Sequence, residues 1–143
     1  MKDLSLTTAR TWATGSALVM YACSLACPVF TFSGHAPVIG LDVLVLGWLG
    51  LLFGPVSWFA NLFLPFTIWA LFKDFRLARY LSIAACGLAL TSLTTTKWWF
   101  NEGSSTEILR FGSGLYLWLG CFLILLVACL LFPRLTIVRA DAP

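Results

Sequence analysis

Four long runs of apolar residues constrain this chain more than any other feature. They cover residues 12–32, 55–72, 78–96 and 114–132 approximately. A helix that crosses a bilayer needs about 20 mainly apolar residues, and each run is close to that length. Hydrophobic residues make up 60% of the chain and charged residues only 10%, whereas a soluble domain carries about 25% charged residues. We therefore predict an all-α membrane protein with four transmembrane helices, built as a single integral membrane domain over residues 1–143.

The stretch from residue 38 to residue 54 is also apolar, and the basic residues decide how it is placed. Lys and Arg concentrate in short loops on the cytoplasmic side of a membrane. If this stretch does not cross, seven basic residues face the cytoplasm and two, Lys97 and Arg110, face outward. The seven are Lys2, Arg10, Lys73, Arg76, Arg79, Arg134 and Arg139. If the stretch crosses, this bias is lost. We therefore predict an outer re-entrant or interfacial helix at 38–54, with the N- and C-termini in the cytoplasm.

One processing alternative concerns the first run, which has a basic flank and could be a cleaved signal peptide. Its apolar part is long for a signal peptide, and no clean small-x-small cleavage site precedes His35. Cleavage would leave the remaining topology unchanged.

Motifs for catalysis and cofactor binding are missing from the sequence. It has no Gly-rich phosphate loop, no HExxH and no CxxC, the patterns that would indicate nucleotide, zinc or redox chemistry. The five Cys residues all lie in apolar runs, where a thiol behaves as a small hydrophobe. The net charge of +3 is too small to indicate nucleic acid. We predict a chain that is not an enzyme and that has no metal, no cofactor and no nucleic-acid partner.

Asn61 is a conspicuous polar residue in the second run, and Trp58 lies three residues before it on the same helix face. An amide in hydrocarbon must find hydrogen-bond partners. Asn61 therefore either fixes the packing of two helices or faces a ligand. Asp42, in the outer stretch, is expected at the water boundary or paired with Arg110 or Lys97.

The connection between the third and fourth runs supplies the other candidate interaction residues. These are Glu102, Glu107, Arg110, Tyr116 and Trp118. Glu107 and Arg110 pair at i, i+3 if Ser105 caps a short helical turn. The aromatic residues here are typical of a membrane-interface belt, with binding as the alternative role.

Two strings in the chain, GWLGLLFGPVSWFAN (47–61) and NEGSSTEILRFGSGLYLWL (101–119), resemble a family of small, uncharacterised bacterial multi-pass membrane proteins. In that family, a Trp-x-Ala-Asn motif follows a Gly-Trp-Leu-Gly segment. An outer loop then ends in a Gly-x-Gly-x-Tyr-Leu-Trp motif at the entry to the last helix. The matching residues are Trp58, Ala60, Asn61, Gly112, Gly114, Tyr116, Leu117 and Trp118. The Pro that often follows the Asn is replaced by Leu62, and Leu115 stands where an aromatic residue is common. The resemblance covers about residues 36–132 and implies a bacterial inner membrane, without an activity to transfer.

These observations lead to two hypotheses on function. The first is a non-enzymatic interaction protein, such as an accessory subunit of a membrane complex or a toxin-immunity protein, because the chain is small and lacks a catalytic set. The alternative is a binder or carrier of a lipid or small apolar molecule at the outer side of the inner membrane. The expected partners are membrane lipids and either a protein partner or a second copy of the chain.

Overall fold

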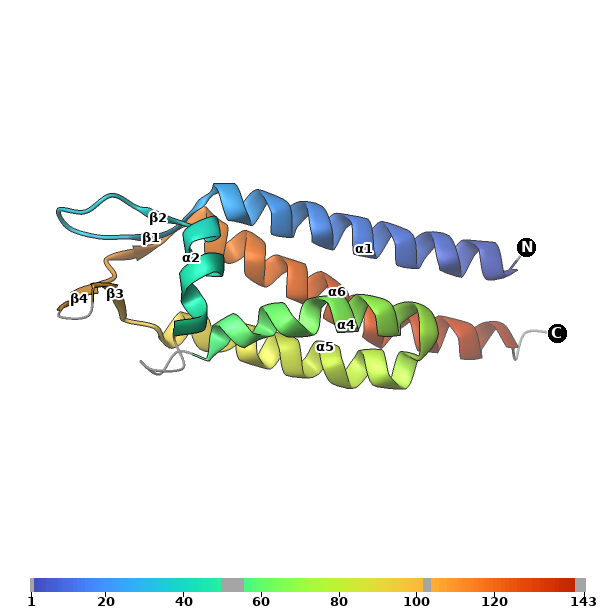
Figure 1. The fold of residues 1–143 in the computed structure, drawn as a ribbon. Coiled ribbons are helices and arrows are strands. Elements are labelled where there is room, and N and C mark those ends of the chain that lie inside the picture. Colours follow the sequence, from blue (N-terminus) through green and yellow to red (C-terminus); the bar gives the residue numbers. More distant parts are fainter. Residues whose placement is uncertain (1, 50–55, 102–103, 141–143) are drawn as a thin grey trace.

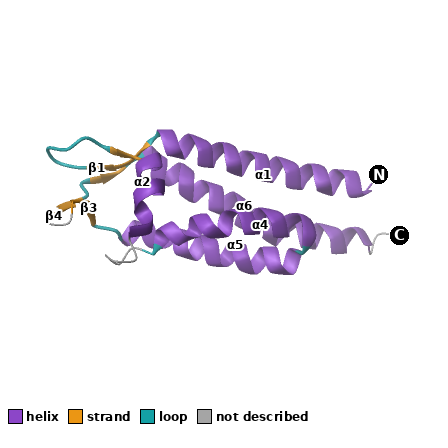
Figure 2. Cartoon of the chain, in the orientation of Figure 1, coloured by secondary structure: helices purple, strands orange, loops and turns teal. Residues whose placement is uncertain are grey.

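The computed structural model describes residues 2–49, 56–101 and 104–140. Four long helices lie side by side, and a short helix, α2, lies across one end of them (Figure 1). The strands extend beyond that same end, whereas α1 begins and α6 ends at the opposite end (Figure 2). We call these the strand end and the terminal end of the bundle.

The elements follow one another in a simple order. The helices are α1 (Lys2–Ala26), α2 (Gly40–Leu46), α4 (Ala60–Lys73), α5 (Phe75–Leu90) and α6 (Ser113–Ala140), with 3-10 turns η1 (Gly47–Leu49), η2 (Ser57–Phe59) and η3 (Thr91–Thr94). The strands are β1 (Pro28–Thr31), β2 (Val38–Ile39), β3 (Lys97–Asn101), β4 (Ser104–Glu107) and β5 (Arg110–Phe111). In space, α6 packs against both α1 and α5, and α5 packs against α4.

Small residues fill the contacts between the helices. Ala17, Ala60 and Cys121 are fully buried in the main core, together with the larger Phe122. Helices that pack in lipid use such small residues to bring their backbones close together. Many other large apolar side chains are exposed, among them Trp12 at 73%.

Two small antiparallel sheets correct the prediction of an all-α chain. One has the strand order β2-β1-β5, and the other is the hairpin of β3 and β4. The Trp and Phe residues of β3 had been interpreted as an interface belt, but aromatic residues are also strong strand formers. Residues 104–107 form strand β4 and not a helical turn, so the predicted i, i+3 pairing of Glu107 with Arg110 on a helix is wrong.

The prediction of four spans is also wrong, because only two helical segments of the described chain are long and apolar enough to cross a membrane. They are Phe75–Thr94 and Ser113–Phe132. Helix α1 has 25 residues, but its Thr, Ser and Gly residues and Arg10 dilute its apolar character. Helix α4 has 14 residues, which gives a length of about 21 Å against a hydrocarbon core of about 30 Å.

The stretch at 38–54, predicted as one re-entrant or interfacial helix, is divided. Within it, β2 leads into the seven-residue helix α2 and then into η1, and residues 50–54 lie outside the described residues. Helix α2 runs across the ends of the long helices (Figure 1). Several residues of α2 line a pocket at the strand end.

Candidate functional site

Asn61 joins three helices at the strand end through its side-chain amide. Its Oδ1 accepts hydrogen bonds from the Tyr21 hydroxyl of α1 at 3.1 Å and from Nε1 of Trp118 of α6 at 2.9 Å. Its Nδ2 donates to the Trp58 carbonyl at 2.9 Å. Two donors on one side and a carbonyl on the other determine which amide atom is oxygen. The amide is thus satisfied within the protein, as a buried polar group requires.

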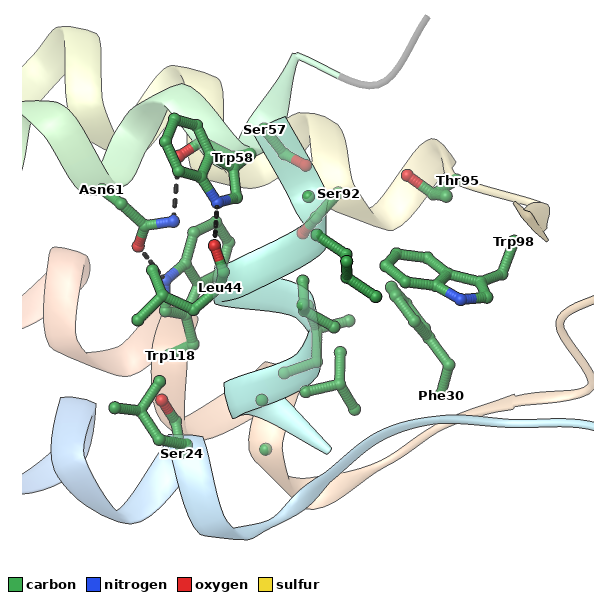
Figure 3. Close-up of a pocket in the computed structure, with 18 of the residues that line it drawn as sticks. Ser24, Phe30, Leu44, Ser57, Trp58, Asn61, Ser92, Thr95, Trp98 and Trp118 are labelled. Atoms are coloured by element: carbon green, nitrogen blue, oxygen red, sulfur yellow. Dashed lines mark hydrogen bonds between the residues drawn. The ribbon is translucent and has the colours of Figure 1, made fainter. Parts of the chain in front are cut away.

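Trp58 extends this network to α2. Its Nε1 donates to the Leu44 carbonyl at 2.8 Å, and Figure 3 shows this bond beside those of Asn61. A Cβ placed on Gly47 would lie 2.5 Å from Cδ1 of the Trp58 ring, so only glycine allows the ring to lie there. Trp58 therefore fixes α2 and η1 against the beginning of α4.

Two glycines bring the beginning of α6 against the turn between α1 and β1. A Cβ on Gly112 would collide with the Pro28 carbonyl, and a Cβ on Gly114 would lie 2.7 Å from the Cys27 carbonyl. The close approach lets the Gly112 amide donate to the Val29 carbonyl at 2.8 Å. As a result, Leu115 and Trp118 of α6 face the same space as α2 at the strand end of the bundle.

A cavity of about 340 Å³ lies in this space. Its walls come from the end of α1, from β1, α2, η1, η2, η3 and β3, and from the beginnings of α4 and α6. Most of the lining is apolar or aromatic, including Phe30, Trp58, Trp98 and Trp118, and the rings of Phe30 and Trp98 lie 5.6 Å apart. Small-molecule sites have this character and volumes of about 300–1,000 Å³. No Asp, Glu, His or Cys stands among the described residues that line the cavity.

Ser92 is a polar side chain of this wall that the protein does not satisfy. It lines the cavity, is 3% exposed, and its Oγ is buried without a hydrogen-bond partner. The hydroxyls of its neighbours Thr91 and Thr94 donate to the carbonyls three residues earlier, at 2.6 and 2.7 Å. A buried hydroxyl without a partner costs about 1–3 kcal/mol. The wall of the cavity thus contains a hydroxyl that the described part of the protein leaves without a hydrogen-bond partner.

The structure places the predicted interaction residues in two groups. Trp58, Asn61 and Trp118 come together at the cavity. The exposed group, none of which lines the cavity, consists of Asp42, Glu107, Arg110 and Tyr116. Glu102 lies outside the described residues.

Asp42 caps a short helix, and its position in the sequence fits that role. Its carboxylate accepts from the Ile39 amide at 3.4 Å and so caps the beginning of α2. Position N3 of a short helix after an extended residue is typical for an acidic capping residue. Asp42 therefore helps to start the helix that covers the cavity.

Three important residues of the site were missed from sequence. Tyr21 and Ser92 lie in apolar runs where hydroxyl side chains are common, and Lys97 was considered only as an outward charge and a possible partner of Asp42. A Ser at the end of a run, just before a strand-forming Lys-Trp-Trp-Phe segment, gave no signal that its hydroxyl would be left without a partner.

Comparison with known proteins gives no match to a family model, a curated protein or a solved structure. Within the chain, the Trp-x-Ala-Asn and Gly-x-Gly-x-Tyr-Leu-Trp motifs lie in contact. Asn61 of the first motif accepts a hydrogen bond from Trp118 of the second.

Proposed function

We propose that this chain is a non-enzymatic protein of a bacterial inner membrane that binds a small, largely apolar molecule in the cavity at its strand end. The observation that carries the proposal is the cavity itself, with its aromatic walls and the unpartnered hydroxyl of Ser92. Apolar walls with a few placed polar groups are the usual composition of a small-molecule site.

Exposed apolar side chains support a membrane location. Val19, Phe66 and Trp69 are between 57% and 63% exposed, and Tyr80 reaches 72%. A soluble monomer rarely exposes contiguous apolar patches above a few hundred Å², whereas lipid solvates such side chains. The two apolar segments in α5 and α6 have span length, and we propose that they cross as an antiparallel pair.

Charge supports an orientation of this pair in which the end of α6 faces the cytoplasm. Lys73, Arg76 and Arg79 lie around the turn between α4 and α5, at the same end as the beginning of α1 and the end of α6 (Figure 1). By the positive-inside rule this end faces the cytoplasm. The cavity then lies toward the outer side of the membrane.

In a membrane, polar contacts determine which molecules the cavity binds in preference to others. Lipid tails are as apolar as Leu or Phe, so a ligand that leaves the bilayer gains little from apolar burial alone. One hydrogen bond to Ser92 offsets the cost of the unpartnered hydroxyl and gives a preference for molecules with one polar end. Asn61 and Trp118 already satisfy each other, so they shape the wall without demanding a partner.

The test is a direct binding measurement on the purified full-length chain. The protein is attached to scintillant beads in mild detergent, and radiolabelled dodecanol is added as a neutral probe. We expect saturable binding at one site per chain. Val43→Phe, which adds volume to a lining residue, should weaken binding at least about ten-fold, as overpacking typically costs about 1–3 kcal/mol.

A matched control lies two residues away on the same helix. Val45 is 58% exposed and does not line the cavity, so Val45→Phe should bind dodecanol as the unchanged chain does. Equal binding by a folded Val43→Phe variant would overturn the proposal. A stoichiometric protein partner together with no saturable dodecanol binding would favour the interaction function that composition predicts.

A further inference from the structure

Lys97 is the one charged side chain among the described residues that line the cavity. It is the first residue of β3 and follows Thr95, also a lining residue, by two positions. Ser92, Thr95 and Lys97 therefore come from one short segment, so that two hydroxyl-bearing residues and one basic residue line the same side of the cavity. Figure 3 shows Ser92 and Thr95 on this side, with Thr95 nearer to the Trp98 ring.

Glu107 lies opposite Lys97 in the register of the hairpin. In the described part of the chain the two side chains form no ion pair, and Glu107 does not line the cavity. Lys97 is exposed and contributes to the cavity wall, so its charge is not neutralised by an ion pair in the described part of the chain. A positive group without an acid in the lining attracts an anion and repels a cation.

From this arrangement we infer that the bound molecule is a single-chain amphiphile with an anionic head group, an inference that rests on the proposed function. The head group lies at the segment 92–97, where Lys97 supplies charge-assisted hydrogen bonds and Ser92 finds its missing partner. The tail lies among Phe30, Leu115 and Trp118, which line the cavity. A volume of about 340 Å³, near the lower limit for small-molecule sites, favours one chain over the two chains of a phospholipid.

The experiment compares ligands of one chain length that differ only in the head group. Bead-bound full-length protein is titrated at pH 8 with radiolabelled dodecanoate, and dodecanol and dodecyltrimethylammonium compete for the site. We expect dodecanoate to bind about ten-fold more tightly than dodecanol, because a hydrogen bond to a charged group is roughly twice as strong as a neutral one. The cation should compete less well than dodecanol.

Three variants assign the preference to Lys97. Lys97→Gln should remove the preference for dodecanoate and leave dodecanol affinity within about two-fold, because only the charge-assisted bond is lost. Lys97→Arg should keep the preference, which shows that the fold tolerates a change at this position. Arg110→Gln removes an exposed charge that does not line the cavity and should change neither affinity.

The source of the anionic head group is tested in a further arm. Lysophosphatidylglycerol and lysophosphatidylcholine carry the same chain under an anionic or a zwitterionic head. Competition by the first as strong as that of dodecanoate assigns the site to lysolipids as well as fatty acids, and its failure restricts the site to fatty acids. Equal binding of dodecanol and dodecanoate to the unchanged chain overturns the inference while the proposed function stands. The absence of saturable binding by every probe overturns the proposed function itself.

Discussion

The two ends of the helix bundle are held together in different ways. At the terminal end, Asp74 alone separates α4 from α5, and Ala70, Leu71, Ala78 and Cys129 form a fully buried cluster. At the strand end, hydrogen bonds centred on Asn61 connect the helices, and a cavity remains between them. One end is closed by apolar packing, and the other is held by directional bonds around a space. From this difference we expect that stability and the proposed binding can be altered separately, and four substitutions test this expectation.

The largest expected effect is that of Asn61→Leu at the strand end. The hydroxyl of Tyr21 and Nε1 of Trp118 both lose their acceptor, which should lower the free energy of unfolding by about 2–4 kcal/mol. Titration with a denaturing detergent, followed by circular dichroism, measures this. Leu62→Ala, at an exposed neighbour, is the control and should change little. Unchanged stability of Asn61→Leu would mean that packing alone holds both ends.

Gly114→Ala should have the next largest effect, because its Cβ would lie 2.7 Å from the backbone carbonyl of Cys27. Overpacking against backbone should cost about 1–3 kcal/mol. Gly87→Ala in α5 is the matched control, since a Cβ there meets nothing within 4 Å, and it should stabilise the helix by up to about 1 kcal/mol. Opposite signs in thermal unfolding are expected, and equal signs would contradict the close approach.

Asp74→Ala probes the terminal end. The carboxylate accepts from the amides of Arg76 and Leu77 at 2.8 and 3.3 Å, so its loss should lower the free energy of unfolding by about 1 kcal/mol. Dodecanol affinity should stay the same, because the change is at the other end of the bundle. Asp74→Asn keeps a capping oxygen and should restore most of the stability. A loss of binding in Asp74→Ala would show that the two ends are coupled.

The smallest effect on stability is expected from Ser92→Ala. The removed hydroxyl has no partner, so the free energy of unfolding should stay the same or rise slightly, while dodecanol binding should weaken by about two- to ten-fold. Ser82→Ala is the comparison, because that buried hydroxyl donates to the Arg79 carbonyl at 2.9 Å and its loss should destabilise without changing binding. A stability loss in Ser92→Ala with unchanged affinity would give Ser92 a structural role only.

Part of the candidate site could be predicted from the sequence, because some side chains are stable in only a few environments. An amide in an apolar run must be hydrogen-bonded, so Asn61 could be expected to join helices. Its partners could not be named, because Tyr21 and Trp118 are 40 and 57 residues away along the chain. Only the fold shows that these distant residues converge.

Other features escaped prediction because local patterns were ambiguous. The aromatic segment at β3 fits both an interface belt and a strand, and pairing with β4 decides in favour of the strand. The apolar runs around α1 and α4 fit spans by composition, yet helix length and interspersed polar residues leave only two such helices in the described chain. The observed elements differ from the predicted ones because tertiary contacts and helix boundaries cannot be read from the residue pattern.

The pairing of β1 with β5 has a consequence for the order in which the molecule assembles. Phe30 pairs with Phe111, so β1 must wait for a partner about 80 residues later in synthesis. Contacts between such distant segments form late in folding. Helices α4 and α5, which pack against each other, can therefore pair while the cavity still lacks the wall that Leu115 and Trp118 provide. The cavity is completed only when α6 has joined α1 and α5, so the proposed ligand has no site before that step.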